Sequence, residues 1–157
     1  HAKLGVAAEN SGKLVTTVRK EARRIAEENG HGMILVDGPP GIGCPVIASV
    51  TGATCVLAVT EPTVSGEHDL ERVLSLARHF DLNAAVCVNK WDLNEEITER
   101  IEQRAMELGA HPAGRIRYDP GFTRAQIGAR SAVEVKCEAS HDIIDVWLRT
   151  GSIMESP

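Results

Sequence analysis

A glycine- and proline-rich loop, DGPPGIG, begins at Asp37. The apolar residues before it, MILVD at 33–37, predict a short buried strand that ends at this acid. An acid there could hold Mg²⁺, directly or through water. Because the two prolines have no backbone N–H, Gly41 is the next free donor after Gly38 and could approach a terminal phosphate. We favour this chemistry over an ordinary turn.

A second loop, VNKWD at 88–92, follows another apolar run. Asn89 can both donate and accept hydrogen bonds at the edge of a purine, and the Lys90 stem can lie along the base or the loop. Asp92 could accept from N1 and N2 of guanine. A motif of four residues is weak support for a purine-binding loop by itself. Its position, one strand and one helix after the Asp37 loop and in the right order, strengthens that interpretation.

A third loop, TEPTVSGEHD, follows the apolar run 54–60. Its polar residues include Glu61, Ser65, His68 and Asp69, which could line a site. Helix capping and solvation explain them equally well, and Ser65 is the predicted N-cap of the next helix. The loop therefore adds candidates without deciding between the two interpretations.

The pair Gly12-Lys13 resembles a phosphate-binding loop but does not meet its requirements. That motif needs four residues between its glycines and a hydroxyl after the lysine. Here Gly5 is too far upstream and Leu14 follows the lysine. The pair instead predicts the first turn of an amphipathic helix, with Ser11 as its N-cap.

Composition limits the class of protein. The chain has 157 residues, of which 43% are hydrophobic and 25% charged, as in a globular domain. Its net charge of -5 argues against nucleic-acid binding, and no apolar run is long enough for a membrane span. The four cysteines lack metal-ligand spacing, so no zinc or iron–sulfur site is expected in this chain, and reduced thiols predict a cytoplasmic location.

Helical and strand-like segments alternate along the chain, which predicts an α/β fold with a parallel sheet and crossover helices. Ligands of such sheets bind where the strands end. The predicted strands are 33–37, 54–60, 83–89 and 114–118. The predicted helices are 11–29, 46–52, one capped by Ser65, one capped by Asn94, 121–128 and 139–149, and 151–157 is expected to be a flexible tail.

The stretch ILVDGPPGIGCPVIASVTGATCVLAVTEPTVSGEHDLERVL, followed by VNKWDLN, resembles the MinD/ParA/Mrp group of P-loop ATPases. The nearest match is the subfamily with an inserted ferredoxin domain, in which ENSGKLV also recurs. The resemblance covers residues 9 to 134. It implies a nucleotide-binding domain of MinD type, of which residues 1–157 would be the C-terminal part, without the P-loop and the ferredoxin insert.

The resemblance also implies roles. Asp37 would be the Mg²⁺-linked acid, and the loop from Gly38 through Gly41 to Gly43 would sense the γ-phosphate. Asn89 would recognise the base, and the backbone around Tyr118 would cover its other edge. Members commonly have proline where this chain has Arg117, which leaves that edge open. Together with the loop residues above, the predicted site comprises Asp37, Gly38, Gly41, Gly43, Glu61, Asn89, Lys90, Asp92 and Tyr118.

The implied activity of the intact protein is binding and hydrolysis of Mg-ATP, coupled to homodimerisation. The iron–sulfur cluster of the insert would serve an electron-transfer partner. Residues 1–157 alone are expected to be inactive. Asn10, Ser11 and Lys13 would then act at a subunit interface.

Two alternatives remain open. A GTP-dependent metallochaperone-type GTPase would use Asp92 to read guanine, although the His/Cys clusters usual in such proteins are absent. A non-catalytic dimerisation or adaptor module would keep the fold without the chemistry. A Rossmann-type dehydrogenase is unlikely on spacing, because the glycines at 38, 41 and 43 do not form G-x-G-x-x-G.

Overall fold

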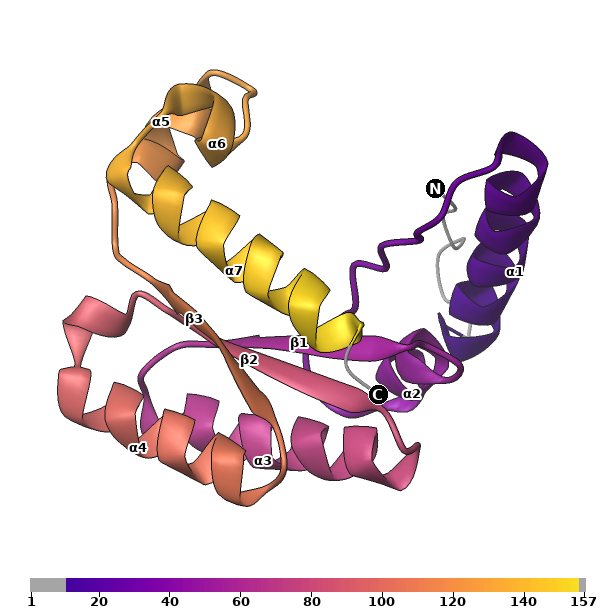
Figure 1. Cartoon of the computed structure of the whole chain (residues 1–157), viewed down its shortest axis with the longest axis horizontal. Coiled ribbons are helices and arrows are strands. Elements are labelled where there is room, and N and C mark those ends of the chain that lie inside the picture. The colour runs from indigo at the N-terminus through magenta and orange to yellow at the C-terminus, as the bar shows by residue number, and fades with distance from the viewer. Residues whose placement is uncertain (1–10, 156–157) are drawn as a thin grey trace. The chain divides into compact units, whose positions relative to one another are not determined.

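The elements of the chain belong to two units. The structure, a computed structural model, describes residues 11–155, and the units divide between Ala53 and Thr54. The first contains α1 and α2, and the second contains the strands and all later helices (Figure 1). Each unit is described here by itself.

The first unit is a pair of helices. The predicted helix α1 has the expected bounds, Ser11–Asn29, and α2 covers Cys44–Val50, two residues earlier than expected. The backbone of Gly12 lies against Cys44, where a Cβ atom would come within 3.3 Å of the Cys44 carbonyl oxygen. Gly12 therefore lies in the first helical turn, as predicted, and the structure adds that it packs closely against α2.

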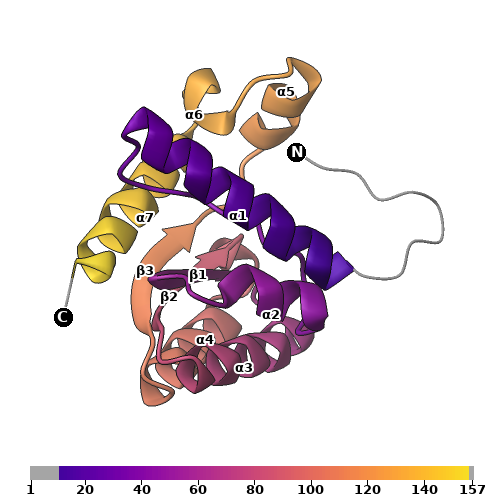
Figure 2. The same ribbon diagram turned by 90° about the vertical axis from the view of Figure 1, so that its right-hand side faces the viewer.

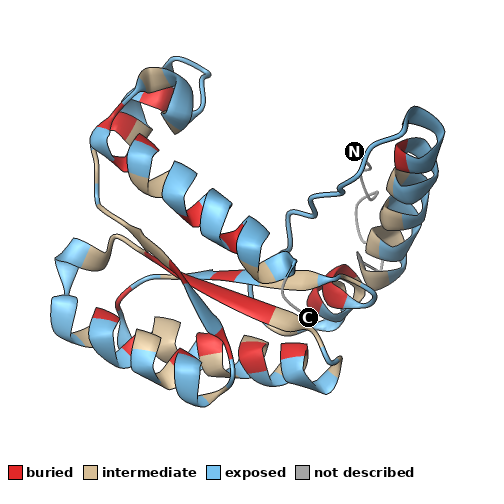
Figure 3. Ribbon diagram, viewed as in Figure 1, coloured by how far each residue is buried: buried red, intermediate tan, exposed pale blue. Residues whose placement is uncertain are grey.

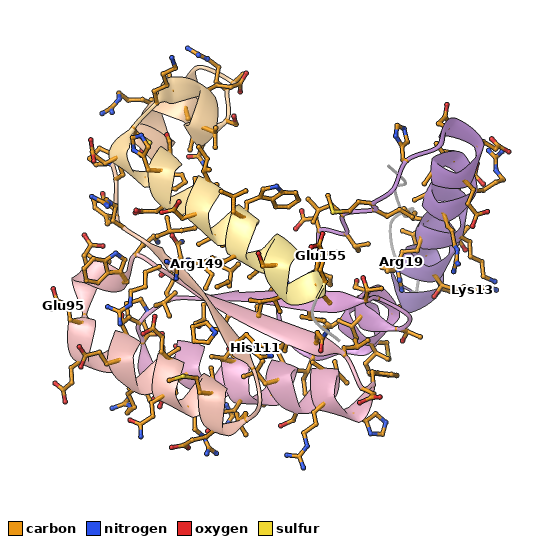
Figure 4. All side chains as sticks on the ribbon, in the orientation of Figure 1. Lys13, Arg19, Glu95, His111, Arg149 and Glu155 are labelled. Carbon is orange, nitrogen blue, oxygen red and sulfur yellow. The ribbon has the colours of Figure 1, made fainter. Side chains whose placement is uncertain are left out.

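Arg19 fastens the two helices of this unit together. Its guanidinium, labelled in Figure 4, donates to the carbonyl oxygens of Ala48, at 2.9 Å, and Thr51 at the end of α2. Carbonyl groups in the last turn of a helix lack partners within that helix, so a cation there is favourable.

The strand predicted at 33–37 was wrong. These residues are extended but pair with no strand, and their apolar side chains are exposed, with Leu35 at 78%. A strand exists through hydrogen bonds to a neighbour, and the described part of the first unit, residues 11–53, contains no other strand. Asp37 therefore does not end a paired strand in this structure.

The second unit is built on a parallel sheet, as predicted. Its strands are β1 (Cys55–Thr60), β2 (Asn83–Asn89) and β3 (His111–Ile116), in the order β1-β2-β3. The central strand is buried from residue 84 to 88 (Figure 3). Its small and branched side chains allow helices to pack on both faces.

Helices cover the two faces of this sheet unequally. α3 (Val64–His79) and α4 (Glu95–Glu107) lie side by side on one face, and α7 (Glu138–Met154) packs on the other, chiefly over β3 (Figures 1 and 2). Two separate apolar clusters result, one on each face. The short elements of this unit are η1 (Trp91–Leu93), α5 (Gly121–Ile127) and α6 (Ala132–Val135).

Several boundaries differ from those predicted. β3 begins three residues before the predicted strand and ends at Ile116, so Arg117 and Tyr118 lie in the loop after it. Pro112 and Gly114 belong to this strand, and the pairing with β2 shifts at that point, where Gly114 has a φ of +133°. α7 continues to Met154, five residues beyond the expected end, which makes the start of the expected tail helical.

One side of the α7 face is apolar and exposed. On β1, Leu57 and Val59 are exposed, the latter at 59%. The neighbouring odd-numbered strand residues Ala85 and Cys87 are covered by α7. α7 itself carries exposed apolar side chains at helical spacing, namely Ile144, Trp147, Leu148 and Met154. One helix is thus too narrow to cover the face that three strands create.

The loop after β1 depends on a glycine. The N-cap of α3 is Thr63 rather than the predicted Ser65, and its hydroxyl accepts the N–H of Gly66 at 2.9 Å. A Cβ atom on Gly66 would overlap the Glu61 carbonyl oxygen and the Thr60 hydroxyl.

We therefore expect Gly66→Ala to lower the free energy of unfolding by about 1–3 kcal/mol, because overpacking here displaces backbone. The matched control is Gly151→Ala, where a Cβ atom meets nothing within 4 Å inside α7. That change should raise stability by up to about 1 kcal/mol through helix propensity. Urea unfolding followed by circular dichroism measures both, and equal stabilities of the two variants would contradict the packing.

Candidate functional site

Five predicted site residues lie at the end of β2 or in the loops that follow β1, β2 and β3. The parallel register pairs Thr60 with Val88 and Asn89 with Ile116, so the three strands end side by side. The residues immediately after each strand are therefore neighbours. Glu61, Asn89, Lys90, Asp92 and Tyr118 all belong to this cluster.

An ion pair joins the first two loops. Lys90 Nζ lies 2.7 Å from Glu61 Oε1, between residues 29 positions apart in the chain. The Lys90 side chain is 37% exposed and that of Glu61 47% exposed. Such a half-exposed pair contributes little to stability, about 0–1 kcal/mol, so its main effect is on geometry.

A carboxylate joins the second and third loops. Asp92 Oδ1 accepts the backbone N–H of Tyr118 at 2.7 Å. A charged acceptor makes this a stronger hydrogen bond than one between neutral groups. Asp92, expected at a guanine edge, thus uses one carboxylate oxygen within the protein. Tyr118 is 54% exposed and its backbone N–H contacts the β2 loop, while its expected place at the other edge of the base stays a prediction.

Asn89 is the candidate with the freest side chain. It is half-buried at the end of β2, and within residues 11–155 no hydrogen bond engages its amide. The next residue, Lys90, and Asp92 two positions beyond it are both held by partners in other loops. An amide with one donor group and one acceptor group can pair with the edge of a purine.

The loop after β3 is fixed to α7 by Arg117. Its backbone N–H donates to Asp142 Oδ2 at 3.0 Å, and its guanidinium donates to both carboxylate oxygens at 2.7 and 3.0 Å. Hydrogen bonding to the Arg117 guanidinium lowers the pKa of Asp142. Burial acts in the opposite direction but has a smaller effect, so the pKa stays below its ordinary value. Proline, usual at this position in the resembling family, could not supply the N–H.

Contacts made by Trp91 and Thr98 stabilise the loop that follows β2. Arg115 lies over the Trp91 ring, 5.4 Å from its centroid, and is itself held by Glu102 at 2.8 and 2.6 Å. The fully buried Thr98 hydroxyl lies 3.0 Å from the Trp91 carbonyl oxygen and 2.9 Å from that of Asn94. Asn94 caps α4 as predicted, accepting the N–H of Ile97 at 3.0 Å.

Asp119 organises the segment after the third loop. Its carboxylate accepts the N–H groups of Gly121, at 2.6 Å, and Ala139, at 3.1 Å, at the starts of α5 and α7. These two backbone hydrogen bonds lower the pKa of Asp119. The residue therefore stays ionised and holds two helix ends beside the site.

The remaining predicted residues belong to the first unit. Asp37 and Gly38 lie in the extended segment, Gly41 has a φ of +91° in the loop, and Gly43 is the N-cap of α2. No Cβ clash exists at Gly41, so its glycine is explained by backbone conformation alone. The predicted roles of these four residues in phosphate and Mg²⁺ binding stay predictions.

The donor set can be compared with the needs of Mg²⁺. Within the described residues, no three His, Cys, Asp or Glu side chains are placed to hold a metal. Mg²⁺ bound with a nucleotide needs only one or two carboxylates, since phosphates and water complete its shell. Asp37 is exposed and able to supply one, so the residues fit a nucleotide-borne ion.

Neither the thiols nor the cavity beside α7 belongs to the predicted site. All four cysteines are free, and burial raises the pKa of Cys87 to about 12, as expected for an inert core thiol. A cavity of about 400 Å³ between α4, β3 and α7 is lined by Arg115 and Arg149 with Glu102 and Asp142, and by none of the predicted site residues. Asn10, which was expected at a subunit interface, lies outside the described residues, as does the side chain of Ser11.

Sequence reasoning missed the groups that hold the loops. Arg117 and Asp142 are 25 positions apart, and Arg115 and Glu102 are 13 apart. A local sequence pattern cannot predict pairs whose members are so far apart in the chain. The one available signal was the departure from the resembling pattern at Arg117, whose backbone N–H and guanidinium both contact Asp142.

Solved structures of MinD proteins are similar to this chain. The MinD cell division protein of Aquifex aeolicus superposes with a TM-score of 0.72 and 29% identity over 91% of this chain. The cell division ATPase MinD of Pyrococcus furiosus gives a TM-score of 0.73 at 17% identity over 92%. The chain spans 62% and 59% of these two structures.

Curated relatives match a shorter stretch. An uncharacterised protein of Methanocaldococcus jannaschii is 32% identical over 91 residues, 58% of this chain and 32% of that protein. A small ribosomal subunit biogenesis GTPase, RsgA of Clostridium perfringens, is 34% identical over 88 residues, 54% of this chain and 30% of that protein. No family model matches the sequence. The chain thus has the α/β fold of the MinD P-loop NTPases.

The pairing of Asp142 with Arg117 predicts a pH dependence of stability. Because the folded-state pKa of Asp142 is lowered, its contribution is present above the ordinary aspartate pKa of about 3.9 and is lost as pH falls below it. Asp142→Asn should flatten the fall in unfolding free energy below about pH 4. The control is Asp145→Asn, an exposed acid on the same helix that forms no ion pair among residues 11–155. Identical pH profiles for both variants would refute this contribution.

Proposed function

We propose that this chain carries the base-binding part of a MinD-type nucleotide site. The single observation behind the proposal is Asn89, whose free amide lies just before two residues that are fixed to neighbouring strand-end loops. In parallel α/β sheets this edge is where ligands bind. The likeness of the fold to MinD ATPases supports a purine nucleotide as the ligand.

Adenine is the proposed base. Reading guanine through Asp92 would require its carboxylate to accept N–H groups of the base, yet one oxygen already accepts the Tyr118 N–H. Because Oδ2 of this carboxylate keeps its acceptor sites, the hydrogen bond does not exclude guanine, and the choice of adenine rests on the likeness to MinD ATPases. The likeness to the RsgA GTPase is the observation that favours GTP as the second candidate.

The phosphate end of the site is proposed to use the first unit. Asp37 would hold Mg²⁺ with phosphate oxygens and water, and Gly41 would donate its N–H to a terminal phosphate. Mg²⁺ supplies charge neutralisation to the phosphates during hydrolysis. The 157 residues contain no G-x-x-x-x-G-K-S/T motif, so we propose that strong phosphate binding requires residues of a longer protein.

Wider features of the proposal rest on the family resemblance. They are Mg-ATP hydrolysis by the intact protein, homodimerisation, a cytoplasmic location, and iron–sulfur chemistry with an electron-transfer partner. No helix within residues 11–155 has the length and apolar character needed to cross a membrane. If the protein were instead a non-catalytic dimerisation module, it would retain the surroundings of Asn89 but would not hydrolyse ATP.

The base site can be tested by Asn89→Ala. Loss of one or two hydrogen bonds to a purine should weaken Mg-ATP binding about tenfold, measured by calorimetry. Gln103→Ala, which removes an exposed amide from α4, should leave the affinity unchanged. Equal affinities of wild type and Asn89→Ala for ATP would overturn the proposed role.

The choice of base has its own test. In competition experiments ATP should displace a fluorescent ATP analogue at lower concentration than GTP. Asp92→Ala should weaken both nucleotides by removing the tie to the Tyr118 loop. A selective loss of GTP binding would instead support guanine recognition by Asp92.

Hydrolysis is expected to require more than residues 1–157. Without the backbone nest and lysine of a P-loop, the phosphates lack their main donors. We expect no single-turnover hydrolysis of radiolabelled ATP by this chain with Mg²⁺ present. Robust turnover that survives repeated purification would show that these 157 residues are sufficient.

A further inference from the structure

We propose that Glu61 and Lys90, the positioning pair, set base selectivity by holding the Asn89 amide in place, without touching the base themselves. This inference rests on the proposed nucleotide site. It assigns to the loop after β1 a part in recognition that its polar composition alone left undecided.

The first argument is the backbone of Lys90. It adopts φ 55° and ψ 38°, the left-handed region that residues with a side chain rarely occupy. Such a conformation is energetically costly and persists only where the surrounding structure enforces it. The residue that turns the chain directly after Asn89 is thus strained, and its ammonium is bound 2.7 Å from Glu61.

The second argument is that the loop carrying Glu61 is held rigidly. The Glu61 carbonyl oxygen lies where a Cβ atom on Gly66 would overlap it, so the loop and the start of α3 are in close contact. Thr60 Oγ1 donates to the Gly66 carbonyl oxygen at 3.0 Å, and Thr63 caps the helix. Glu61 therefore extends from a braced loop, and a fixed anion can orient a longer cation.

The third argument is that the other end of the loop has an independent anchor. Asp92 accepts the Tyr118 N–H at 2.7 Å, and Trp91 lies under Arg115. Asn89 therefore precedes a short loop tied on one side to β1 and on the other to β3. Removing the positioning pair releases the strained side only, so the loop should relax without unfolding the unit.

A relaxed loop would act on base recognition and not on the phosphates. Lys90 is occupied by Glu61, so it is unavailable as a phosphate ligand in this arrangement. Orientation of Asn89 matters for a hydrogen bond to a purine, which weakens steeply with angle. The expected signature is loss of discrimination between purine and pyrimidine nucleotides.

The test compares Glu61→Ala, Lys90→Ala and the charge exchange Glu61→Lys with Lys90→Glu. Each chain is titrated with Mg-ATP and Mg-UTP, which share phosphates and ribose. The single variants should lower the ATP to UTP affinity ratio about two- to fivefold, the effect expected from losing a half-exposed ion pair, and leave UTP binding unchanged. The charge exchange should recover part of the ratio.

A matched control uses another ion pair. Glu71 and Arg104 join α3 to α4 with side chains 37% and 42% exposed, so Arg104→Ala removes a comparably exposed bridge outside the three loops. Its affinity ratio should equal that of the wild type. Unfolding free energies of all variants, measured in urea, identify any variant that fails through stability.

The outcomes separate the inference from the function beneath it. If the wild type binds ATP, Asn89→Ala weakens binding and Glu61→Ala does not, the positioning role is overturned while the base site stands. An equal fall for ATP and UTP would also overturn it, because the pair would then act on binding in general. If the wild type shows no preference for ATP over UTP, the base site itself is refuted.

Discussion

Parallel pairing of β2 with both of its neighbours is the constraint on which the candidate site depends. Because all three strands run in the same direction, their carboxyl ends meet at one edge of the sheet. Strand β2 can hold this central place because residues 84–88 are buried on both faces. Any change that tilted it would separate loops whose residues lie far apart in the sequence.

The loops at that edge are joined by charged groups, whereas the sheet below them is joined by apolar packing. Lys90 with Glu61, and Asp92 with the Tyr118 N–H, make one connected arrangement across three loops. Arg117 with Asp142 then fixes the last loop to α7. Each of these contacts is individually modest, since exposed pairs are weak. Together they define where a ligand could lie without adding much to global stability.

Local signals were sufficient for much of the fold. α1, β2 and the Asn94 cap were predicted with their correct residues because helix periodicity, apolar runs and capping chemistry are local. The segment 33–37 shows where such reasoning stops, because an apolar run becomes a strand only when a partner strand is present. The start of β3 was missed because Pro112 makes residues 111–113 look unlike a strand.

The candidate site divides in the same way. Residue types and order were enough to select Asn89, Lys90 and Asp92 from VNKWD, because the motif is contiguous. Their internal partners were not predictable. Whether Asp92 faces a base or a backbone N–H depends on a loop 26 positions away. The sequence therefore indicated which residues to examine, and the structure showed which of their atoms are already engaged.

The two edges of the sheet differ in a way that concerns growth of the sheet. β1 is regular, with uninterrupted pairing over its six residues, whereas β3 carries Pro112, which has no N–H, and a register shift. If two copies of the sheet paired through their β1 edges, only the irregular β3 edges would remain for further pairing. Continuous stacking of the amyloid type needs two usable edges. The edge formed by β3 is therefore less suited to pairing with a further strand than the edge formed by β1.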